Sequence, residues 1–315
     1  MPRPSDLEID AATAISRGRR EYQEDAVITD FPIGGEIALA VVADGMGGHA
    51  AGDVASKIAV TEVFSDLKLQ SGCPDAFEAR APQLMRGAVE AANGCIASHS
   101  QSVAETRGMG ATLLAIAILR DRLFWISVGD SPLLLFRDGA LAQINEDHSL
   151  APQIDYLVRA GQMTAEEGRH HPDRSCLTSV LCGGRIPHVD CPQEPLLLSD
   201  QDVLIAATDG IQSLAPDEIV AVLKRAGRSS AEIARALLDA VEGQNDPDQD
   251  NVTVSVIRVA RSQSQQPSRV LGKMTAPGFA MARMAEKSYT AVRNVLLGGR
   301  LAHSGNSCHG RKETG

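Results

Sequence analysis

Short runs of mostly apolar residues, separated by polar turns, dominate the chain and predict many strands. These runs cover residues 9–16, 26–31, 37–43, 111–119, 122–128, 132–137, 141–145, 203–208 and 251–259. Apolar residues at helical spacing predict helices over residues 50–64, 74–100, 216–226 and 230–242. The predicted fold is therefore an α+β domain with layers of helices and antiparallel strands.

The run from Ile37 to Ala43 carries no charge, which is typical of a strand buried on both faces. It ends abruptly in Asp44-Gly45-Met46-Gly47-Gly48, so Asp44 is expected to leave the core at the edge of the strand. The glycines let the backbone turn sharply and come close to whatever Asp44 holds. A plain Asp-Gly turn would also explain this pattern.

Two nucleotide-binding alternatives are excluded for this loop. A P-loop requires GxxxxGK[ST], and no Lys follows these glycines. A dinucleotide-binding turn requires GxGxxG, which is absent, and Asp44 stands where its first glycine is needed. A metal-binding loop remains, and it requires further ligands elsewhere in the chain.

Further carboxylates stand at the ends of predicted strands. Asp209 follows the run 203–208, and Asp250 precedes the run 251–259. The other candidates are Glu24, Asp25 and Asp130. If these strand ends converge, the clustered carboxylates repel one another unless cations neutralise them. Ligation by oxygen alone, without His or Cys, favours Mg²⁺ or Mn²⁺.

The region 111–145 is expected to form a meander of antiparallel strands, with a hairpin turn at Asp138-Gly139 and with Trp125 in the core. Residues 147–175 are expected to be partly helical. The pair His170-His171 suggests a metal site, but a third ligand at suitable spacing is missing.

Composition narrows the function classes. A chain of 315 residues holds one large domain or two small ones. An apolar share of 43% and a mean hydropathy of -0.08 describe a globular protein. Aromatic residues make up 3% and the net charge is -10, which argues against nucleic acid as a main partner. No signal peptide pattern and no membrane-spanning run is found, so a cytoplasmic enzyme is expected. The six cysteines show no CxxC pair and are expected to be free and mostly buried.

The charge is unevenly distributed between body and tail. From residue 261 onward, nine Lys or Arg stand against two acidic residues. We therefore expect a domain over residues 1–259 and a basic, flexible tail over residues 260–315. A basic amphipathic helix near residues 280–297 could contact a membrane surface or a partner protein.

The motifs resemble those of the metal-dependent serine/threonine protein phosphatases (PPM, type 2C), in the form of the bacterial branch. They occur in the family's order between residues 9 and 259: REYQEDA (20–26), VADGMGGHAAGDVAS (42–56), GMGAT (108–112), VGDS (128–131), ATDG (207–210) and QDNVT (249–253). Each motif is weak alone, but six in register are specific. The resemblance implies a β-sandwich of two antiparallel sheets flanked by helices (αββα), with the metals at one end.

Carried over residue by residue, the resemblance implies the following roles. Asp44 bridges two ions, the Gly45 carbonyl completes one side, and Asp209 and Asp250 hold the other ion. Glu24 and Asp25 contact metal-bound waters, Arg20 grips the substrate phosphate, and Asp130 belongs to a third, weaker metal site. A water bridging the ions attacks the phosphorus of phosphoserine or phosphothreonine. His49 either protonates the leaving oxygen or supports the following helix.

Three functional hypotheses follow. The first is an active Mn²⁺- or Mg²⁺-dependent protein phosphatase, expected to be monomeric and to oppose a Ser/Thr kinase. The second is a catalytically silent module that keeps the fold for binding, although no metal carboxylate is missing. The third is a phosphatase of small phosphoesters. None of these hypotheses requires a Cys-x5-Arg phosphatase loop or a GxSxG elbow, and neither occurs in the chain.

Overall fold

The computed structural model describes residues 7–32, 35–48, 50–227 and 229–261. His49 lies outside these residues, and so does the predicted tail apart from Ala260 and Arg261, which end the last strand. The helix expected near residues 280–297 therefore stays a prediction. Within the described ranges, we find no helix with both the length and the apolar character needed to cross a bilayer.

Two antiparallel sheets form the centre of the fold. The five-stranded sheet has the order β1 (Leu7–Ser16), β11 (Val252–Arg261), β10 (Val203–Ala207), β7 (Leu133–Arg137) and β8 (Ala140–Gln143). The six-stranded sheet has the order β2 (Asp25–Asp30), β3 (Ile37–Met46), β5 (Leu113–Leu119), β6 (Arg122–Val128) and β9 (Leu196–Leu197), with β4 (Gly110–Ala111) paired to the end of β3.

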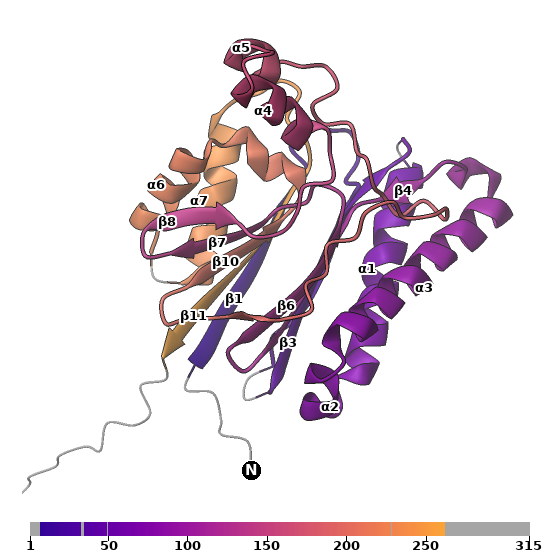
Figure 1. Cartoon of the computed structure of the whole chain (residues 1–315), viewed down its shortest axis with the longest axis vertical. Helices are drawn as coiled ribbons and strands as arrows, with labels where there is room; N and C mark the ends of the chain where they lie inside the picture. Colours follow the sequence, from indigo (N-terminus) through magenta and orange to yellow (C-terminus); the bar gives the residue numbers. More distant parts are fainter. Residues whose placement is uncertain (1–6, 33–34, 49, 228, 262–315) are drawn as a thin grey trace, which may run out of the picture. The chain divides into compact units, whose positions relative to one another are not determined.

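Helices cover the outer faces of both sheets (Figure 1). The six-stranded sheet is covered by α1 (Ala50–Gln70) and α3 (Ala81–Ser102), which are joined through the short α2 (Pro74–Glu78). The five-stranded sheet is covered by α6 (Pro216–Arg225) and α7 (Ser230–Gly243). Two 3-10 turns, η1 (Ala104–Thr106) and η2 (Asp209–Ser213), complete these layers. The predicted αββα sandwich is confirmed.

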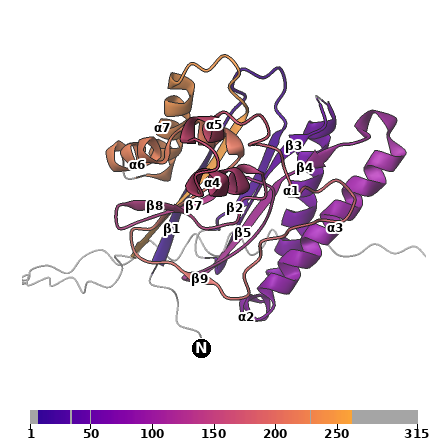
Figure 2. The ribbon, with the colours of Figure 1, turned by 45° about the horizontal axis from the view of Figure 1, so that its top comes forward.

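A helical lobe, α4 (Ala151–Arg159) and α5 (Ala165–Arg169), lies beyond one end of the sandwich, at the top of Figure 1. This finding agrees with the expectation of a partly helical segment over residues 147–175. Figure 2 shows α4 and α5 in front of the sheets, between α6 and the α1–α3 layer.

Strand β3 is buried on both faces, as its uncharged run predicts. Leu39 and Val41 belong to the apolar cluster under α1 and α3, whereas Ala40 and Val42 belong to the cluster between the two sheets. This division follows from the two-residue period of a strand, in which successive side chains point to opposite faces. The chain can thus fill both interfaces of the sheet with small aliphatic side chains.

Two details near the site differ from the sequence-based expectation. Strand β3 continues to Met46, because Gly45 and Met46 pair with Ala111 and Gly110 of β4, so Asp44 lies inside the strand and not at its end. The expected meander over residues 111–145 is wrong: β5 and β6 form a hairpin in one sheet, and β7 and β8 form a hairpin in the other. The chain changes sheets at the turn between β6 and β7.

Three smaller expectations have mixed outcomes. Asp138 and Gly139 form the predicted tight hairpin turn, with φ of 52° and 84°. Trp125 is buried as predicted, and its Nε1 donates to Asp190 Oδ2 at 2.9 Å. The expectation of mostly buried thiols is wrong, because the described cysteines are all free but include three exposed ones, Cys73, Cys176 and Cys182.

Candidate metal centre

Carboxylates from both sheets converge at one end of the sandwich. Asp25, the first residue of β2, lies directly opposite Asp44 of β3. Asp130 follows β6, Asp209 follows β10, and Asp250 precedes β11. Because neighbouring strands are antiparallel, the start of one strand and the end of the next share an edge. The structure therefore brings the five predicted aspartates together.

Asp25 connects the two sheets. Its Oδ2 accepts hydrogen bonds from Thr208 Oγ1 at 2.9 Å and from Thr253 Oγ1 at 2.8 Å, although Asp25 belongs to the opposite sheet. Thr208 Oγ1 also accepts a hydrogen bond from the Thr253 backbone at 2.9 Å. The two hydroxyl groups therefore fix the Asp25 carboxylate at the seam between the sheets.

The Asp44 backbone is held by Thr112, which lies between β4 and β5. The Asp44 N–H donates to Thr112 Oγ1 at 2.9 Å, and the Thr112 N–H donates to the Asp44 carbonyl at 2.8 Å. Thr112 Oγ1 is also 2.8 Å from Ser131 Oγ, next to Asp130. This buried pair of hydroxyls links the segments that carry Asp44 and Asp130.

Gly45 allows a close approach of three backbone segments. Its N–H donates to the Glu24 carbonyl at 3.1 Å, and a Cβ at this position would stand 2.0 Å from the carbonyl oxygen of Gly52. A Cβ on Gly52 would in turn stand 2.4 Å from Glu24 Oε1. Sequence reasoning assigned close approach to the glycines directly after Asp44 and missed Gly52, the last glycine of the motif 42–56.

The loop that carries Arg20 packs against the loop that carries Asp250. Gly18 has a φ of +60°, and a Cβ there would stand 2.2 Å from the Asp250 carbonyl oxygen. The Arg19 N–H donates to the Gln249 carbonyl at 2.9 Å. Arg20 Nη2 then donates to Asp250 Oδ2 at 2.7 Å, with 53% of the arginine side chain exposed. The predicted phosphate-gripping arginine thus stands at the rim of the carboxylate cluster.

Asn251 supports the site, a role that sequence reasoning did not assign. Its Oδ1 accepts from the Glu24 N–H at 2.7 Å, and its Nδ2 donates to the carbonyls of Arg17 at 2.9 Å and Tyr22 at 3.0 Å. One buried amide therefore fixes the loop between β1 and β2. A signal existed, since Thr112, Thr208, Asn251 and Thr253 all lie in motifs that match the family.

The carboxyl groups perturb one another strongly. Burial raises the pKa of Asp25 to about 7, with further contributions from the charges of Asp209 and Asp250, and hydrogen bonds from Thr253 and Thr208 oppose this shift. Burial and the neighbouring aspartates raise the pKa of Asp44 to about 10. Burial raises the pKa of Asp130 to about 7 and that of Asp209 to about 6, with added repulsion from Asp209 and Asp250 respectively. Such a cluster favours either protons or cations.

The residues present fit a pair of hard divalent cations. Asp25 Oδ1 and Asp209 Oδ1 are buried and accept no hydrogen bond within the described part of the chain. Buried acceptors of this kind are normally satisfied, so they are available to an ion or to its water. Across the described part of the chain, no three His, Cys, Asp or Glu side chains stand close enough together to form a complete metal site without some movement. The donor set contains oxygen only, which suits Mg²⁺ or Mn²⁺ better than Zn²⁺.

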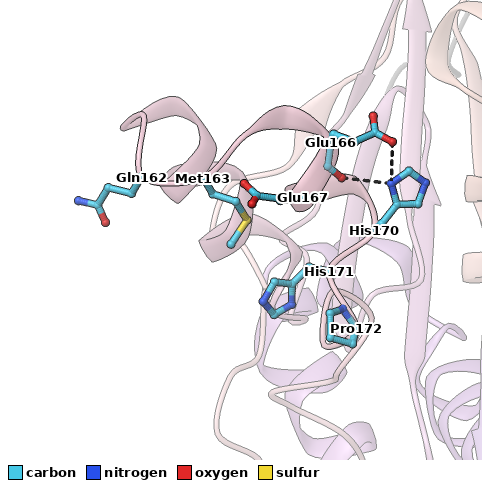
Figure 3. A pocket seen from close by; sticks show the side chains of 7 residues that line it. All are labelled: Gln162, Met163, Glu166, Glu167, His170, His171 and Pro172. Carbon is cyan, nitrogen blue, oxygen red and sulfur yellow. Dashed lines mark hydrogen bonds and ion pairs between the residues drawn. The ribbon is translucent and has the colours of Figure 1, made fainter.

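The histidine pair lies in a different place. His170 and His171 line a cavity of about 600 Å³ on the helical lobe, together with Gln162, Met163, Glu166, Glu167 and Pro172 (Figure 3). His170 Nδ1 lies 3.1 Å from the Glu166 carbonyl oxygen and 3.2 Å from its Oε1. His171 Nδ1 accepts from the Asp173 N–H at 3.2 Å. The metal site that this pair suggests therefore stays a hypothesis from the sequence.

Comparisons with known proteins agree with this geometry. The family model described as "Protein phosphatase 2C" matches residues 16–239. The chain is 30% identical over 219 residues to the serine/threonine phosphatase stp of Listeria welshimeri, covering 70% of this chain and 83% of that protein. It is 31% identical over 257 residues to the serine/threonine protein phosphatase PstP of Mycobacterium tuberculosis, covering 78% of this chain and 46% of PstP.

A solved structure shows the same fold with metal bound. The catalytic domain of PstP in complex with two manganese ions is 30% identical, with a TM-score of 0.64, and the match covers 81% of this chain and 99% of that one. Family model, relatives and fold thus agree with the carboxylate cluster at the end of the sandwich. The chain belongs to the protein phosphatase 2C family.

Proposed function

We propose that this chain hydrolyses phosphoserine and phosphothreonine in proteins with two divalent cations, Mn²⁺ or Mg²⁺, held at the carboxylate cluster. The observation that carries the proposal is the convergence of five aspartates from two sheets at one end of the sandwich, where hydroxyl groups of the opposite sheet hold one of them, Asp25, in place. A cluster with such raised pKa values has no structural benefit of its own, so its presence favours cation binding.

The role of each side chain follows from its position. Asp44 faces Asp25 across β2 and β3 and is perturbed by all the other aspartates, so we assign it the bridge between the ions. The Gly45 carbonyl would be a further ligand beside Asp44, and Asp209 and Asp250 would hold the second ion. Asp25 and Glu24 would accept hydrogen bonds from water around the ions. Asp130 would contribute to a third, weaker site.

Arg20 is the group that we assign to the substrate phosphate. A guanidinium has five N–H donors in a planar fork that matches two phosphate oxygens. One donor lies on Asp250, and the half-exposed side chain leaves others at the rim of the cluster. Arg20 would therefore orient the phosphate for in-line displacement and stabilise its charge in the transition state.

The bound ions would supply a nucleophilic water at neutral pH and charge stabilisation at the phosphate. The chain's own contribution is positional. Thr112 fixes the backbone of Asp44, Asn251 fixes the loop that carries Glu24, and Thr208 and Thr253 fix Asp25. Such support holds groups within the narrow geometric range that catalysis requires.

The test is hydrolysis of a phosphopeptide by Asp44→Asn and Asp209→Asn variants. We expect loss of activity by a factor on the order of 10² or more, because an amide is a poorer ligand for a hard cation. Asp239→Asn on the outer face of α7 is the matched control and should retain activity, since that carboxylate is 68% exposed. Full activity in excess chelator, or unchanged activity of both site variants, would refute the proposal.

The same purified protein can be used to test the two other hypotheses. A catalytically silent binding module predicts no Mn²⁺ binding by calorimetry. A phosphatase of small phosphoesters predicts faster hydrolysis of free phosphoserine than of a phosphoprotein. We further propose that the enzyme is a monomer that opposes a Ser/Thr kinase. Its cytoplasmic location, and the contact of its tail with a membrane surface or a partner, stay predictions from the sequence.

A further inference from the structure

The helical lobe is joined to the sandwich by a narrow neck. Residues 148–150 enter the lobe and residues 176–178 leave it, and the two segments run side by side. The Leu150 N–H donates to the Cys176 carbonyl at 3.0 Å, and the Thr178 N–H and Oγ1 donate to the His148 carbonyl at 2.7 and 2.8 Å. His148 therefore lies at the end of this neck that is nearer to the sandwich.

His148 also grips the turn that presents Asp130. Its backbone N–H donates to the Gly129 carbonyl at 3.0 Å, and its ring Nδ1 accepts from the Gly129 N–H at 3.2 Å. Gly129 has a φ of +102°, a conformation that other residues rarely adopt. Both hydrogen-bonding groups of this glycine thus depend on one histidine, which is only 5% exposed.

The hydrogen-bond pattern assigns the state of the ring. An Nδ1 that accepts a hydrogen bond carries no proton, so the proton of the neutral ring is on Nε2. Nε2 is buried and makes no hydrogen bond in the described structure. The nearest carboxylate, Glu146 Oε2, is 3.7 Å away, which is too long for one. Burial lowers the pKa of His148, which keeps the ring neutral and Nδ1 an acceptor.

The opposite side of the same turn rests on Thr112. A Cβ on Gly129 would stand 2.7 Å from the Thr112 Cβ and Cγ2, so the turn packs tightly there. Thr112 in turn holds the Asp44 backbone. The Gly129 turn is therefore clamped between His148, at the neck of the lobe, and Thr112, at the carboxylate cluster.

We propose that His148 is a positioning residue that ties the neck of the α4–α5 lobe to the Gly129–Asp130 turn and thereby sets the affinity of the Asp130 site for a divalent cation. The inference rests on the proposed function, because it takes Asp130 as a cation ligand. It adds a structural link between the lobe and the Asp130 site, because both contact His148. A change in the position of the lobe should therefore change cation binding at Asp130, and the reverse.

The test compares Mn²⁺ binding by calorimetry in His148→Phe and His148→Asn. Phe keeps a ring but removes the acceptor, whereas the Asn Oδ1 occupies a position close to that of Nδ1. We expect Phe to weaken the Asp130-dependent site by about 10-fold, as loss of a group that supports a metal ligand does. Asn should restore binding to within about 3-fold of the wild type, because the hydrogen bond to Gly129 is kept.

Two controls separate positioning from a general structural effect. His188→Phe alters the ring beside His148, with centroids 5.9 Å apart, and should leave Mn²⁺ binding unchanged because the Gly129 N–H donates to His148 and not to His188. In the Asp130→Asn background, His148→Phe should have no further effect on Mn²⁺ binding. A further loss in that background would overturn the inference, since His148 would then act on another site.

Nitrogen-15 NMR of the unsubstituted protein provides a readout that does not depend on the folding of a variant. The His148 ring should show its proton on Nε2, and saturating Mg²⁺ should shift the Gly129 and Thr178 amide signals together. A proton on Nδ1, or binding by His148→Phe that equals the wild type, would overturn the inference. If Asp130→Asn binds like the wild type, the inference falls and the two-ion proposal stands; if the wild type binds no Mn²⁺, both fall.

Discussion

Removing metal should make the stability of this protein fall steeply as the pH rises. Asp25 and Asp130 are each only 6% exposed, and their environment raises the pKa of each to about 7. Well below pH 3.8 both groups are protonated in the folded and the unfolded chain, so they impose no penalty. As the pH rises, the unfolded chain releases these protons while the folded chain retains them, and folding becomes less favourable until the folded pKa is passed.

The magnitude follows from the size of the shift. One unit of pKa corresponds to about 1.4 kcal/mol, so a rise from 3.8 to about 7 removes at most about 4 kcal/mol of stability for one such group by about pH 7. Asp209, with its pKa raised to about 6, acts in the same direction between about pH 4 and 6. For a domain of this size, 1 kcal/mol moves the melting temperature by about 2–4 °C. Between about pH 5 and pH 7 the three groups together remove up to about 7 kcal/mol, so a fall in melting temperature of roughly 14–28 °C is expected between about pH 5 and pH 7.5.

The assay is scanning calorimetry of protein freed of metal by chelator and dialysis, across this range, with and without millimolar Mn²⁺. Bound cations stabilise the ionised carboxylates, so Mn²⁺ should flatten the profile and raise the melting temperature most at pH 7.5. Asp130→Asn in metal-free protein should be more stable than the wild type at pH 7.5, and this difference should shrink steadily as the pH falls toward about 4. A metal-free profile that is flat or rises with pH would contradict the reasoning.

Two substitutions test the supporting residues. Gly52→Ala should lower phosphopeptide hydrolysis and reduce the free energy of unfolding, measured in urea, by about 1–3 kcal/mol, because the added Cβ would overlap Glu24 Oε1 and the Gly45 carbonyl oxygen. Full activity would show that this close packing is dispensable. Thr112→Val should lower the free energy of unfolding by about 1–3 kcal/mol and weaken Mn²⁺ binding, because the Asp44 N–H and Ser131 Oγ lose their partner. Thr112→Ser should retain the stability and the Mn²⁺ binding of the wild type. Equal effects of Val and Ser would refute this role of the hydroxyl.

The local elements around the site were predictable because they depend on neighbouring residues. The uncharged run before Asp44 predicts a strand covered on both faces, and Asp138-Gly139 predicts a tight hairpin turn, and both are confirmed. The sheet to which each hairpin belongs was not predictable. The step from β6 to β7 reads locally as one more turn of a meander, yet it carries the chain from one sheet to the other.

The support of the carboxylates was missed for a related reason. Thr208 and Thr253 hold Asp25 across 183 and 228 residues of sequence, and no local pattern reports such a pairing. Only the match to family motifs draws attention to these threonines, and it does not say what they contact. The end of β3 was misplaced in the same way, because its last two residues pair with Gly110 and Ala111, far along the chain.

One non-local feature can nevertheless be found in the sequence: the order of apolar and polar residues on the strand faces between the sheets, which recurs with a period of two. Alternate residues of a strand share a face, so the residues of each central strand that face the opposite sheet can be read in order toward the site. These series are Val259, Ile257, Ser255, Thr253 and Asn251 in β11 and its approach; Ala38, Ala40, Val42 and Asp44 in β3; and Leu204, Ala206 and Thr208 in β10 and the residue after it.

Each series changes from apolar to polar in the same direction along the seam between the sheets. At the apolar end, burial of aliphatic side chains stabilises the sandwich. At the polar end, apolar contacts cannot satisfy the buried polar groups. Carboxylates placed there lack the water that would solvate them, which is why their pKa values rise and why cations are required to hold them ionised. Stability and the proposed catalysis therefore depend on opposite ends of one interface. Replacing a polar residue of these series with an apolar one, progressively closer to Thr253, should stabilise the metal-free protein and weaken its binding of cations.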